Sequence, residues 1–325
     1  MLTIVMYHYV RDLPNSAYPR IKGLQAELFD GQLDHICRHY SVCSLRQVVA
    51  AARGETPLPP KACLLTFDDG FTDHREVVLP RLLQRGITGS FYPPVRCAEE
   101  RWVLDVHKVQ FIIAVSLDVE KLVKDVLAAV AEHRAVHDLP DDETLLRTYR
   151  GPSRFDSPEI IFVKRLLQHG LPQQVRQAVI DRLFERRVSH DEKAFADELY
   201  MSVGQLQEML AAGMEVGGHG YAHDWLEHFP LEQQAADIQH TVGFLERLQG
   251  TPPRDWTMCY PYGSYNETTL KLLRQAGCAL GLTTKVGVNA DLSRPLELQR
   301  LDTNDLPFTG DAQTCEWTRK ADADP

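Results

Sequence analysis

The sequence predicts an α/β fold in which parallel strands alternate with helices, as a barrel or a doubly wound sheet. Seven short apolar runs support this prediction, because most are followed by a stretch with helical spacing. Most runs are too continuously apolar to have one wet face, which is typical of parallel strands covered on both sides. With 325 residues, 44% of them apolar and 25% charged, the chain is long enough for one large or two ordinary globular domains.

Local signals define the individual elements. The predicted strands, in chain order, are 2–7, 62–67, 87–92, 214–217, 256–260, 278–283 and 297–301. Capping boxes at Ser44 and Ser202 predict two helix starts. Glycines that can close a helix in the left-handed region follow five helical stretches, at Gly54, Gly86, Gly213, Gly250 and Gly277. In both architectures the carboxyl ends of the strands meet at one face, so the residues leaving each strand are the candidates for chemistry.

One long segment interrupts the alternation. Residues 97–199 have little strand character and several helical repeats, which predicts a helical insertion between the third and fourth strands. We expect it to act as a lid or brace, with a partner surface, including a homo-oligomer interface, as the alternative. The barrel would then be discontinuous, over 1–96 and 200–315, followed by a frayed tail over 316–325.

Charge and composition restrict the partners and the compartment. The formal net charge is -10, which opposes binding to nucleic acid or to anionic membranes. The first residues resemble a strand rather than a signal peptide, and no apolar run approaches the ~20 residues of a membrane span. The 7 cysteines are scattered without a C-x-x-C pair, which suits a reducing environment. We therefore expect a cytoplasmic protein with no nucleic-acid partner and no membrane span.

Two adjacent carboxylates follow the second predicted strand, in the segment Thr66-Phe67-Asp68-Asp69-Gly70. Like charges at the end of a buried run are costly to leave unpaired. Before a glycine that can turn the chain, both side chains can reach the same cavity. The alternative is a surface turn, since Asp-Gly is a common turn dipeptide.

A histidine pair, His219 and His223, follows the fourth predicted strand and its Gly-Gly pair. Imidazoles at i and i+4 on one turn can bind one metal ion. Spacing alone is weak evidence, because 13 histidines in 325 residues produce about 0.5 such pair by chance. Two other pairs with this spacing fall in predicted helices and are expected to be structural, namely His35 with His39 and His133 with His137.

Asp69, His219 and His223 together would form a three-ligand site with open positions, as in catalytic rather than structural zinc sites. Zn²⁺ is the expected ion, and Co²⁺ or Mn²⁺ would suit similar ligands. Asp68 would then be free to act as a base beside a water whose pKa the cation lowers toward ~7. This set of groups suits hydrolysis of an amide or an ester.

Aromatic and polar residues near the other strand ends suit a carbohydrate or another small polar ligand. A packed turn is the alternative for the segment 259–263. The residues expected to contact substrate are His8, Tyr92, Trp225, Tyr260 and Asp305.

Three of these segments resemble motifs of the polysaccharide deacetylases, carbohydrate esterase family 4, also called the NodB homology domain. T-F-D-D-G matches residues 66–70, the two histidines of H-[ST]-x-x-H match His219 and His223, and P-Y-G matches 261–263. The resemblance covers roughly 1–92 and 200–305, and it implies a distorted (β/α)₇ barrel.

The resemblance also implies roles for single residues. Asp68 would be the catalytic base, Asp69 a metal ligand, and the Tyr262 backbone N–H a donor to the oxyanion. The second motif departs from the family at Gly220, where a hydroxyl residue is usual. The arginine that normally precedes P-Y-G is absent, and Arg300 is the candidate to orient Asp68 in its place.

The family's general acid, a histidine near the C-terminus, has no counterpart because the last histidine is His240. The candidates to replace it are His228, His74, His8, His107 and Asp305. His228 and His74 are preferred, since they lie near the metal turn and the aspartate pair in the sequence. Alternatively, the activated water and Asp68 share the proton transfers.

The resemblance implies a metal-dependent hydrolase that removes an N-acetyl or other N-/O-acyl group from a sugar. The extended segments 6–12 and 219–226 resemble an intracellular branch associated with surface polysaccharide biosynthesis of the O-antigen or lipopolysaccharide type. The substrate would be an acylated sugar, nucleotide-sugar or lipid-linked glycan precursor. The alternatives are a non-catalytic carbohydrate-binding relative and an amidohydrolase that acts on a cyclic amide.

Overall fold

The computed structural model of the protein describes residues 1–153 and 156–322. The chain divides into two compact units, which we call the barrel unit and the helical unit. The barrel unit comprises Met1–Asp12, Gly23–Trp102 and the chain from Ala196 on. The helical unit comprises Leu13–Lys22 and Val103–Phe195. All the strands described below lie in the barrel unit.

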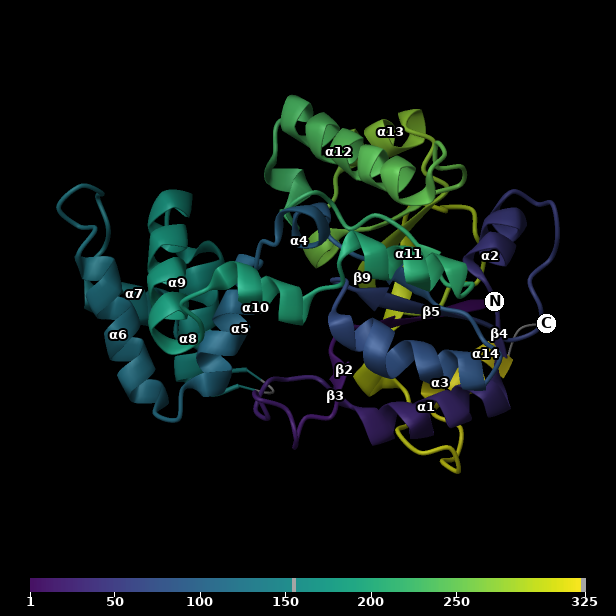
Figure 1. Ribbon diagram of the computed structural model, residues 1–325, viewed down its shortest axis with the longest axis horizontal. Coiled ribbons are helices and arrows are strands. Elements are labelled where there is room, and N and C mark those ends of the chain that lie inside the picture. Colours follow the sequence, from purple (N-terminus) through teal and green to yellow (C-terminus); the bar gives the residue numbers. More distant parts are fainter. Residues whose placement is uncertain (154–155, 323–325) are drawn as a thin grey trace. The chain divides into compact units, whose positions relative to one another are not determined.

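A parallel sheet forms the centre of the barrel unit, in the order β7-β6-β5-β1-β10-β9-β8 (Figure 1). These strands are β1 (Leu2–Tyr7), β5 (Ala62–Asp68), β6 (Ser90–Tyr92), β7 (Glu215–Val216), β8 (Thr257–Cys259), β9 (Leu280–Val286) and β10 (Leu298–Asp302). They coincide with the seven apolar runs, so the predicted α/β fold is confirmed. Three short strands complete the set, with β4 (Ser41–Val42) beside β5, and β2 (Val10–Arg11) beside β3 (Leu24–Gln25).

The two ends of this sheet meet and close a distorted barrel. Gly218, just after β7, forms an isolated parallel bridge with Met258 of β8. Glycine is required here, because a Cβ at Gly218 would lie 2.3 Å from the Thr241 methyl group. The neighbouring Gly217 has the same constraint, since its Cβ would lie 2.4 Å from the Tyr92 ring. The Gly-Gly pair therefore allows the chain to approach β8 closely just before His219.

Helices connect the strands of the barrel unit (Figure 1). They are α1 (Ala26–His39), α2 (Leu45–Ala52), α3 (Leu79–Gln84), α4 (Val95–Glu100), α11 (Val203–Ala211), α12 (Leu231–Gln249), α13 (Glu267–Gln275) and α14 (Glu316–Asp322), with short π or 3₁₀ turns at His74–Val78, Leu226–His228, Pro261–Gly263 and Thr303–Asp305. The capping boxes predicted at Ser44 and Ser202 are both present. All five predicted closing glycines have a positive φ. Local sequence therefore accounts for these helix boundaries.

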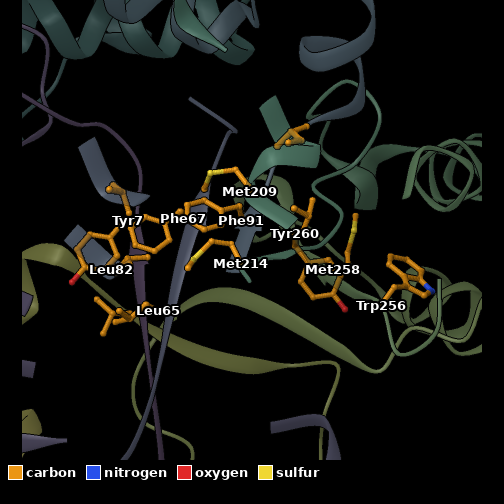
Figure 2. Close-up of a cluster of buried hydrophobic side chains, with 14 of the residues drawn as sticks. Tyr7, Leu65, Phe67, Leu82, Phe91, Met209, Met214, Trp256, Met258 and Tyr260 are labelled. Atoms are coloured by element: carbon orange, nitrogen blue, oxygen red, sulfur yellow. The ribbon is translucent and has the colours of Figure 1, made fainter. Parts of the chain in front are cut away.

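Alternate residues of the central strands enter two buried clusters, as the strand period requires. Leu2, Ile4 and Leu64 belong to a cluster that draws on strands from all round the sheet and so fills the barrel interior. Val5, Leu65 and Phe67 lie on the opposite strand face and belong to the cluster shown in Figure 2, where Phe67 stacks between Tyr7 and Phe91 at centroid distances of 5.0 and 4.8 Å. Burial on both faces explains why these strands appear as continuous apolar runs.

The helical unit contains the helices expected between the third and fourth strands. They are α5 (Asp105–Val115), α6 (Val119–Ala131), α7 (Asp142–Tyr149), α8 (Pro158–Arg165), the π turn Leu166–Gly170 and α9 (Gln173–Arg187), while α10 (Glu192–Leu199) crosses from this unit into the barrel unit. The unit also takes up Leu13–Lys22, where Tyr18 packs edge-on against Phe111 and Phe195. The insertion predicted over 97–199 did not include this N-terminal segment. Among the described residues, no helix is long and apolar enough to cross a membrane.

The chain end differs from the frayed tail expected over 316–325. Its described part forms α14, which is anchored by Thr318 and Ala321, both buried. The Thr318 hydroxyl lies 3.2 Å from the Tyr40 hydroxyl and 3.3 Å from His35 Nε2. The acidic and small residues of this segment do not predict a helix, because this helix is stabilised by tertiary contacts. Residues 323–325 lie outside the described part of the chain.

Candidate active site

Three predicted metal ligands, far apart in the sequence, meet beside the end of β5. His219 Nε2 lies 3.4 Å and His223 Nε2 3.5 Å from the same Asp69 oxygen, Oδ1. All three side chains are at most 8% exposed. The ligand atoms of this group lie within 4.8 Å of one another.

The donor set and its spacing fit a divalent cation. Two ligands of a tetrahedral ion with bonds of about 2.1 Å lie about 3.4 Å apart, close to the separations described above. His219 Nδ1 lies 2.8 Å from the Cys259 carbonyl, and donation to that oxygen would direct the Nε2 lone pair toward Asp69. Burial lowers the pKa of His219, but Cys259 and the two carboxylates outweigh it and raise this pKa well above its ordinary value. A metal ion requires the unprotonated ring, and the negative charge that raises this pKa also favours a cation at Nε2.

Backbone conformation turns these ligands toward one point. Asp69 leaves β5 with φ of 73°, in the left-handed region, while its N–H donates to the Tyr92 carbonyl at 3.0 Å. His223 has φ of 59°. Positive φ is uncommon for residues other than glycine and has an energetic cost, which the surrounding structure must offset. Strained ligand positions of this kind are typical of functional sites.

Asp68 lies inside the barrel, on the same strand face as Leu64 and Thr66. Arg300 of β10 binds it through two parallel hydrogen bonds, Nη1 to Oδ1 at 2.9 Å and Nη2 to Oδ2 at 2.8 Å. Burial raises the pKa of Asp68, but Arg300 together with the nearby His219 and His8 outweighs this effect and lowers the pKa to about 2. The carboxylate is therefore held ionised, and the suggestion that Arg300 orients Asp68 agrees with this geometry.

Cys259 contacts both Asp68 and the predicted metal ligand His219, and it was not singled out from the sequence. Its thiol donates to Asp68 Oδ2 at 3.2 Å, and its carbonyl faces His219. It stands two residues before Pro261, in the segment where the family's arginine was missing. That departure was the available signal, because it indicated that other groups must surround Asp68, and both Cys259 and Arg300 contact it.

Tyr262 has the geometry of a strained turn, with φ of 57°. Its ring stacks on Trp225 at 4.4 Å and 5°, and it meets the His223 ring edge-on at 4.5 Å. The His228 ring stacks on the other ring neighbour of this group, Trp225, with a centroid distance of 5.7 Å and an interplanar angle of 13°. This row of rings extends from the metal ligands to solvent, because His228 is 67% exposed.

Two further histidines near the aspartate pair, His8 and His74, differ in accessibility. His8, directly after β1, is 41% exposed, and its Nε2 lies 4.0 Å from Asp68 Oδ2. His74 is fully buried with its Nε2 2.9 Å from the His8 carbonyl. Burial lowers the pKa of His74 to about 4. His74 therefore supports the backbone of His8 rather than meeting solvent, although the sequence had favoured it as a general acid.

The other predicted site residues are buried or make hydrogen bonds only within their own part of the fold, as far as the structure describes them. Tyr92 and Tyr260 are both fully buried, with their hydroxyls 3.1 Å from Thr257 Oγ1 and 2.8 Å from the Leu296 carbonyl, so they form the wall rather than a substrate surface. Asp305 accepts the Asp302 N–H at 2.9 Å and closes a local turn. His107 is buried on α5, in the helical unit.

Comparisons with known proteins agree with the resemblance found in the sequence. Residues 181–281 match the family model described as polysaccharide deacetylase, a stretch that contains both histidine ligands and P-Y-G but not T-F-D-D-G. A search of the curated proteins finds no match.

Solved structures share the fold across nearly the whole chain. IcaB from Ammonifex degensii is 19% identical, with a TM-score of 0.57 over 99% of this chain and 95% of that chain. The Streptococcus pyogenes deacetylase PplD is 18% identical, with a TM-score of 0.53 over 93% and 91%. A de-N-acetylase from Aggregatibacter actinomycetemcomitans is 16% identical, with a TM-score of 0.52 over 96% and 97%. The resemblance to the polysaccharide deacetylases is thus confirmed, by the family model over residues 181–281 and by these structures at the level of the fold.

Proposed function

We propose that this chain is a metal-dependent hydrolase that removes an N-acetyl, or another N- or O-linked acyl group, from a sugar or glycan precursor. The observation that carries the proposal is the meeting of Asp69, His219 and His223 beside a second carboxylate, Asp68, which Arg300 holds through two hydrogen bonds. A protein that only binds sugar has no need of an ionised base at that place.

Asp69, His219 and His223 would hold the cation. When bound, a divalent cation polarises the amide carbonyl and lowers the pKa of water toward ~7. Zinc suits two imidazoles and one carboxylate, and cobalt or manganese suits similar ligands.

The remaining steps fall to side chains and backbone of this chain. Asp68, oriented by Arg300, takes the proton of the attacking water. The Tyr262 N–H donates to the oxygen on which negative charge develops. His8 gives a proton to the departing amine, because it is exposed and next to Asp68, whereas His74 is buried and His228 lies at the outer end of the ring stack. This choice replaces the earlier preference for His228 and His74.

We further propose a cytoplasmic role in surface polysaccharide biosynthesis, on a nucleotide-linked or lipid-linked precursor of the O-antigen or lipopolysaccharide type. All seven cysteines carry free thiols, which supports a reducing compartment. Two departures had favoured a non-catalytic carbohydrate-binding relative, the missing arginine and the missing terminal histidine. Arg300 and His8 supply groups of the same kind at Asp68, which disfavours that alternative.

Acetate release from N-acetylated sugar nucleotides and short oligosaccharides, with and without a chelator, tests the proposal. In Asp68→Asn we expect turnover to fall by about 10²-fold or more while the metal content is unchanged. In His219→Ala we expect loss of both metal and activity, because one of three ligands is removed.

His133→Ala is the matched control, because His133 also belongs to an i, i+4 histidine pair but lies in the helical unit. It should keep both metal and turnover. Full turnover by a protein stripped of divalent cations, or equal metal content in His219→Ala, would contradict the proposal.

A further inference from the structure

The metal-binding turn between His219 and His223 is tightly bent and depends on outside support. Gly220 has φ of 72° and His223 has φ of 59°. The carbonyls of Gly220 and Tyr221 accept hydrogen bonds from the first turn of α4, from the Val95 N–H at 3.1 Å and the Arg96 N–H at 2.9 Å. These bonds hold one side of the turn.

The opposite side of the turn is held by a carboxylate from α12. Asp237 Oδ2 accepts the Tyr221 N–H at 2.9 Å. Asp237 is 6% exposed, and its other oxygen, Oδ1, has no hydrogen-bond partner in the part of the chain that the structure describes. A buried carboxylate with an unpartnered oxygen lowers stability, so its presence requires an explanation.

The position of Asp237 coincides with the family departure at Gly220. A Cβ at residue 220 would lie 3.4 and 3.5 Å from the two Asp237 oxygens and 3.3 Å from Pro261. A hydroxyl side chain at 220 would therefore occupy the region where the Asp237 carboxylate now lies. In this chain the polar group that supports the turn therefore comes from the neighbouring helix and not from residue 220.

We infer that Asp237 is a positioning residue for the metal centre, which fixes the backbone between His219 and His223 so that both imidazoles face Asp69. The inference rests on the proposed function, because it takes this turn to be metal-binding. Asp237 touches no reacting atom. Asp237 restricts the turn before the metal binds, so less conformational entropy is lost on binding.

Matched variants on α12 separate this role from general support of the helix. Asp237→Ala removes the acceptor of the Tyr221 N–H. Asp237→Asn keeps an acceptor oxygen and has the shape of the protonated acid. Burial favours that protonated form, because it raises the pKa of Asp237 to about 7. Thr241→Val is the control, because Thr241 is buried one turn further on and its hydroxyl, among the described residues, donates only to the Asp237 carbonyl in its own helix, at 3.0 Å.

The measurement is the affinity for Zn²⁺ and Co²⁺ by competition with a chromophoric chelator, with the visible spectrum of the Co²⁺ form as a report of ligand geometry. We expect Asp237→Ala to bind 10- to 100-fold more weakly and to show an altered Co²⁺ spectrum, as is typical when an outer support of metal ligands is lost. Asp237→Asn and Thr241→Val should remain within about threefold of the wild type.

The outcomes separate this inference from the proposed function. Wild-type affinity in Asp237→Ala, or equal losses in Asp237→Ala and Asp237→Asn, would overturn the inference alone. A wild-type chain that binds neither cation would overturn both. Amide hydrogen exchange of Tyr221 in the metal-free wild type covers the case in which Asp237→Ala does not fold. Protection supports the inference, and rapid exchange overturns it.

Discussion

Single residues determine the electrostatics of the candidate site, and Arg300 forms a buried ion pair with Asp68 there. Both side chains are at most 2% exposed. A buried pair of this kind has an uncertain net effect on stability, but removing one partner leaves an uncompensated charge. The ionised state of the buried Asp68 carboxylate therefore depends strongly on the positive charge of Arg300.

Arg300→Met should lower the free energy of unfolding by about 3–5 kcal/mol, because Asp68 is left buried without its counter-ion. The pKa of Asp68 should rise from about 2, since burial is then less opposed. Urea unfolding and the pH dependence of turnover measure the two effects. Arg300→Lys, which restores the charge without two parallel bonds, should be intermediate, and a loss below about 1 kcal/mol in Arg300→Met would contradict the argument.

His74 makes stability depend on pH. Its pKa is lowered to about 4 in the folded protein, against about 6.5 when unfolded. Above pH 6.5 both states are neutral and nothing is lost. As the pH falls from 6.5 toward 4, His74 binds a proton in the unfolded state but not in the folded state. The free energy of unfolding therefore decreases by up to about 3 kcal/mol.

Denaturant unfolding of the metal-free protein between pH 7 and pH 4 tests this effect. In His74→Gln the decrease over this range should be smaller than in the wild type by about 3 kcal/mol. His133→Gln provides the control and should follow the wild-type curve. Parallel curves for His74→Gln and the wild type would show that His74 does not titrate as described.

At the scale of elements, the capped helices and α14 differ in what determines them. The boxes at Ser44 and Ser202 rest on bonds within four residues, so the sequence predicts them correctly. Helix α14 rests on contacts of Thr318 with His35 and Tyr40, more than 270 positions earlier. No local pattern could reveal such contacts.

Thr318→Val should lower the free energy of unfolding by about 1–3 kcal/mol, because the buried Tyr40 hydroxyl and the His35 ring lose a shared partner. Valine has nearly the same shape, so packing is retained. Thermal unfolding measures the loss. Glu316→Gln, on the exposed face of the same helix, should leave the transition unchanged, and an equal effect in both variants would indicate that the buried hydroxyl is unimportant.

At the scale of the whole molecule, the candidate site and the helical unit are built from different parts of the chain. Every residue of the metal cluster and of the Asp68 pair belongs to the barrel unit. Arg101 and Asp197, which flank the excursion into the helical unit, are paired with Nε 2.6 Å from Oδ1. A short linker can therefore span this point, and we propose that the helical unit is dispensable for metal binding.

Replacing Val103–Phe195 with a short glycine-serine linker should leave stoichiometric metal binding intact, because all three ligands remain. Metal analysis, turnover and light scattering of the deletion protein distinguish the roles proposed for the helices. Lost turnover with retained metal would favour a lid or brace, and a change of oligomeric state would favour a homo-oligomer interface. Loss of the metal would contradict the proposal that the site is independent of this unit.

The sequence by itself determined the alternation of strands and helices, the helix caps and the grouping of candidate ligands at strand ends. These features depend on hydrophobic period and on bonds between near neighbours, which a linear pattern records. Asp69 and the histidine pair could be selected because each follows a strand of a parallel sheet.

Beyond the meeting of Asp69 with the histidine pair, the tertiary structure alone decided which distant groups lie together. It buried Tyr92 and Tyr260, placed His8 beside Asp68, and brought Asp237 against the turn at Gly220. The curvature of the sheet and the closure at Gly218 set these distances. Such distances arise from packing over the whole barrel, and for that reason they have no counterpart in the order of residues along the chain.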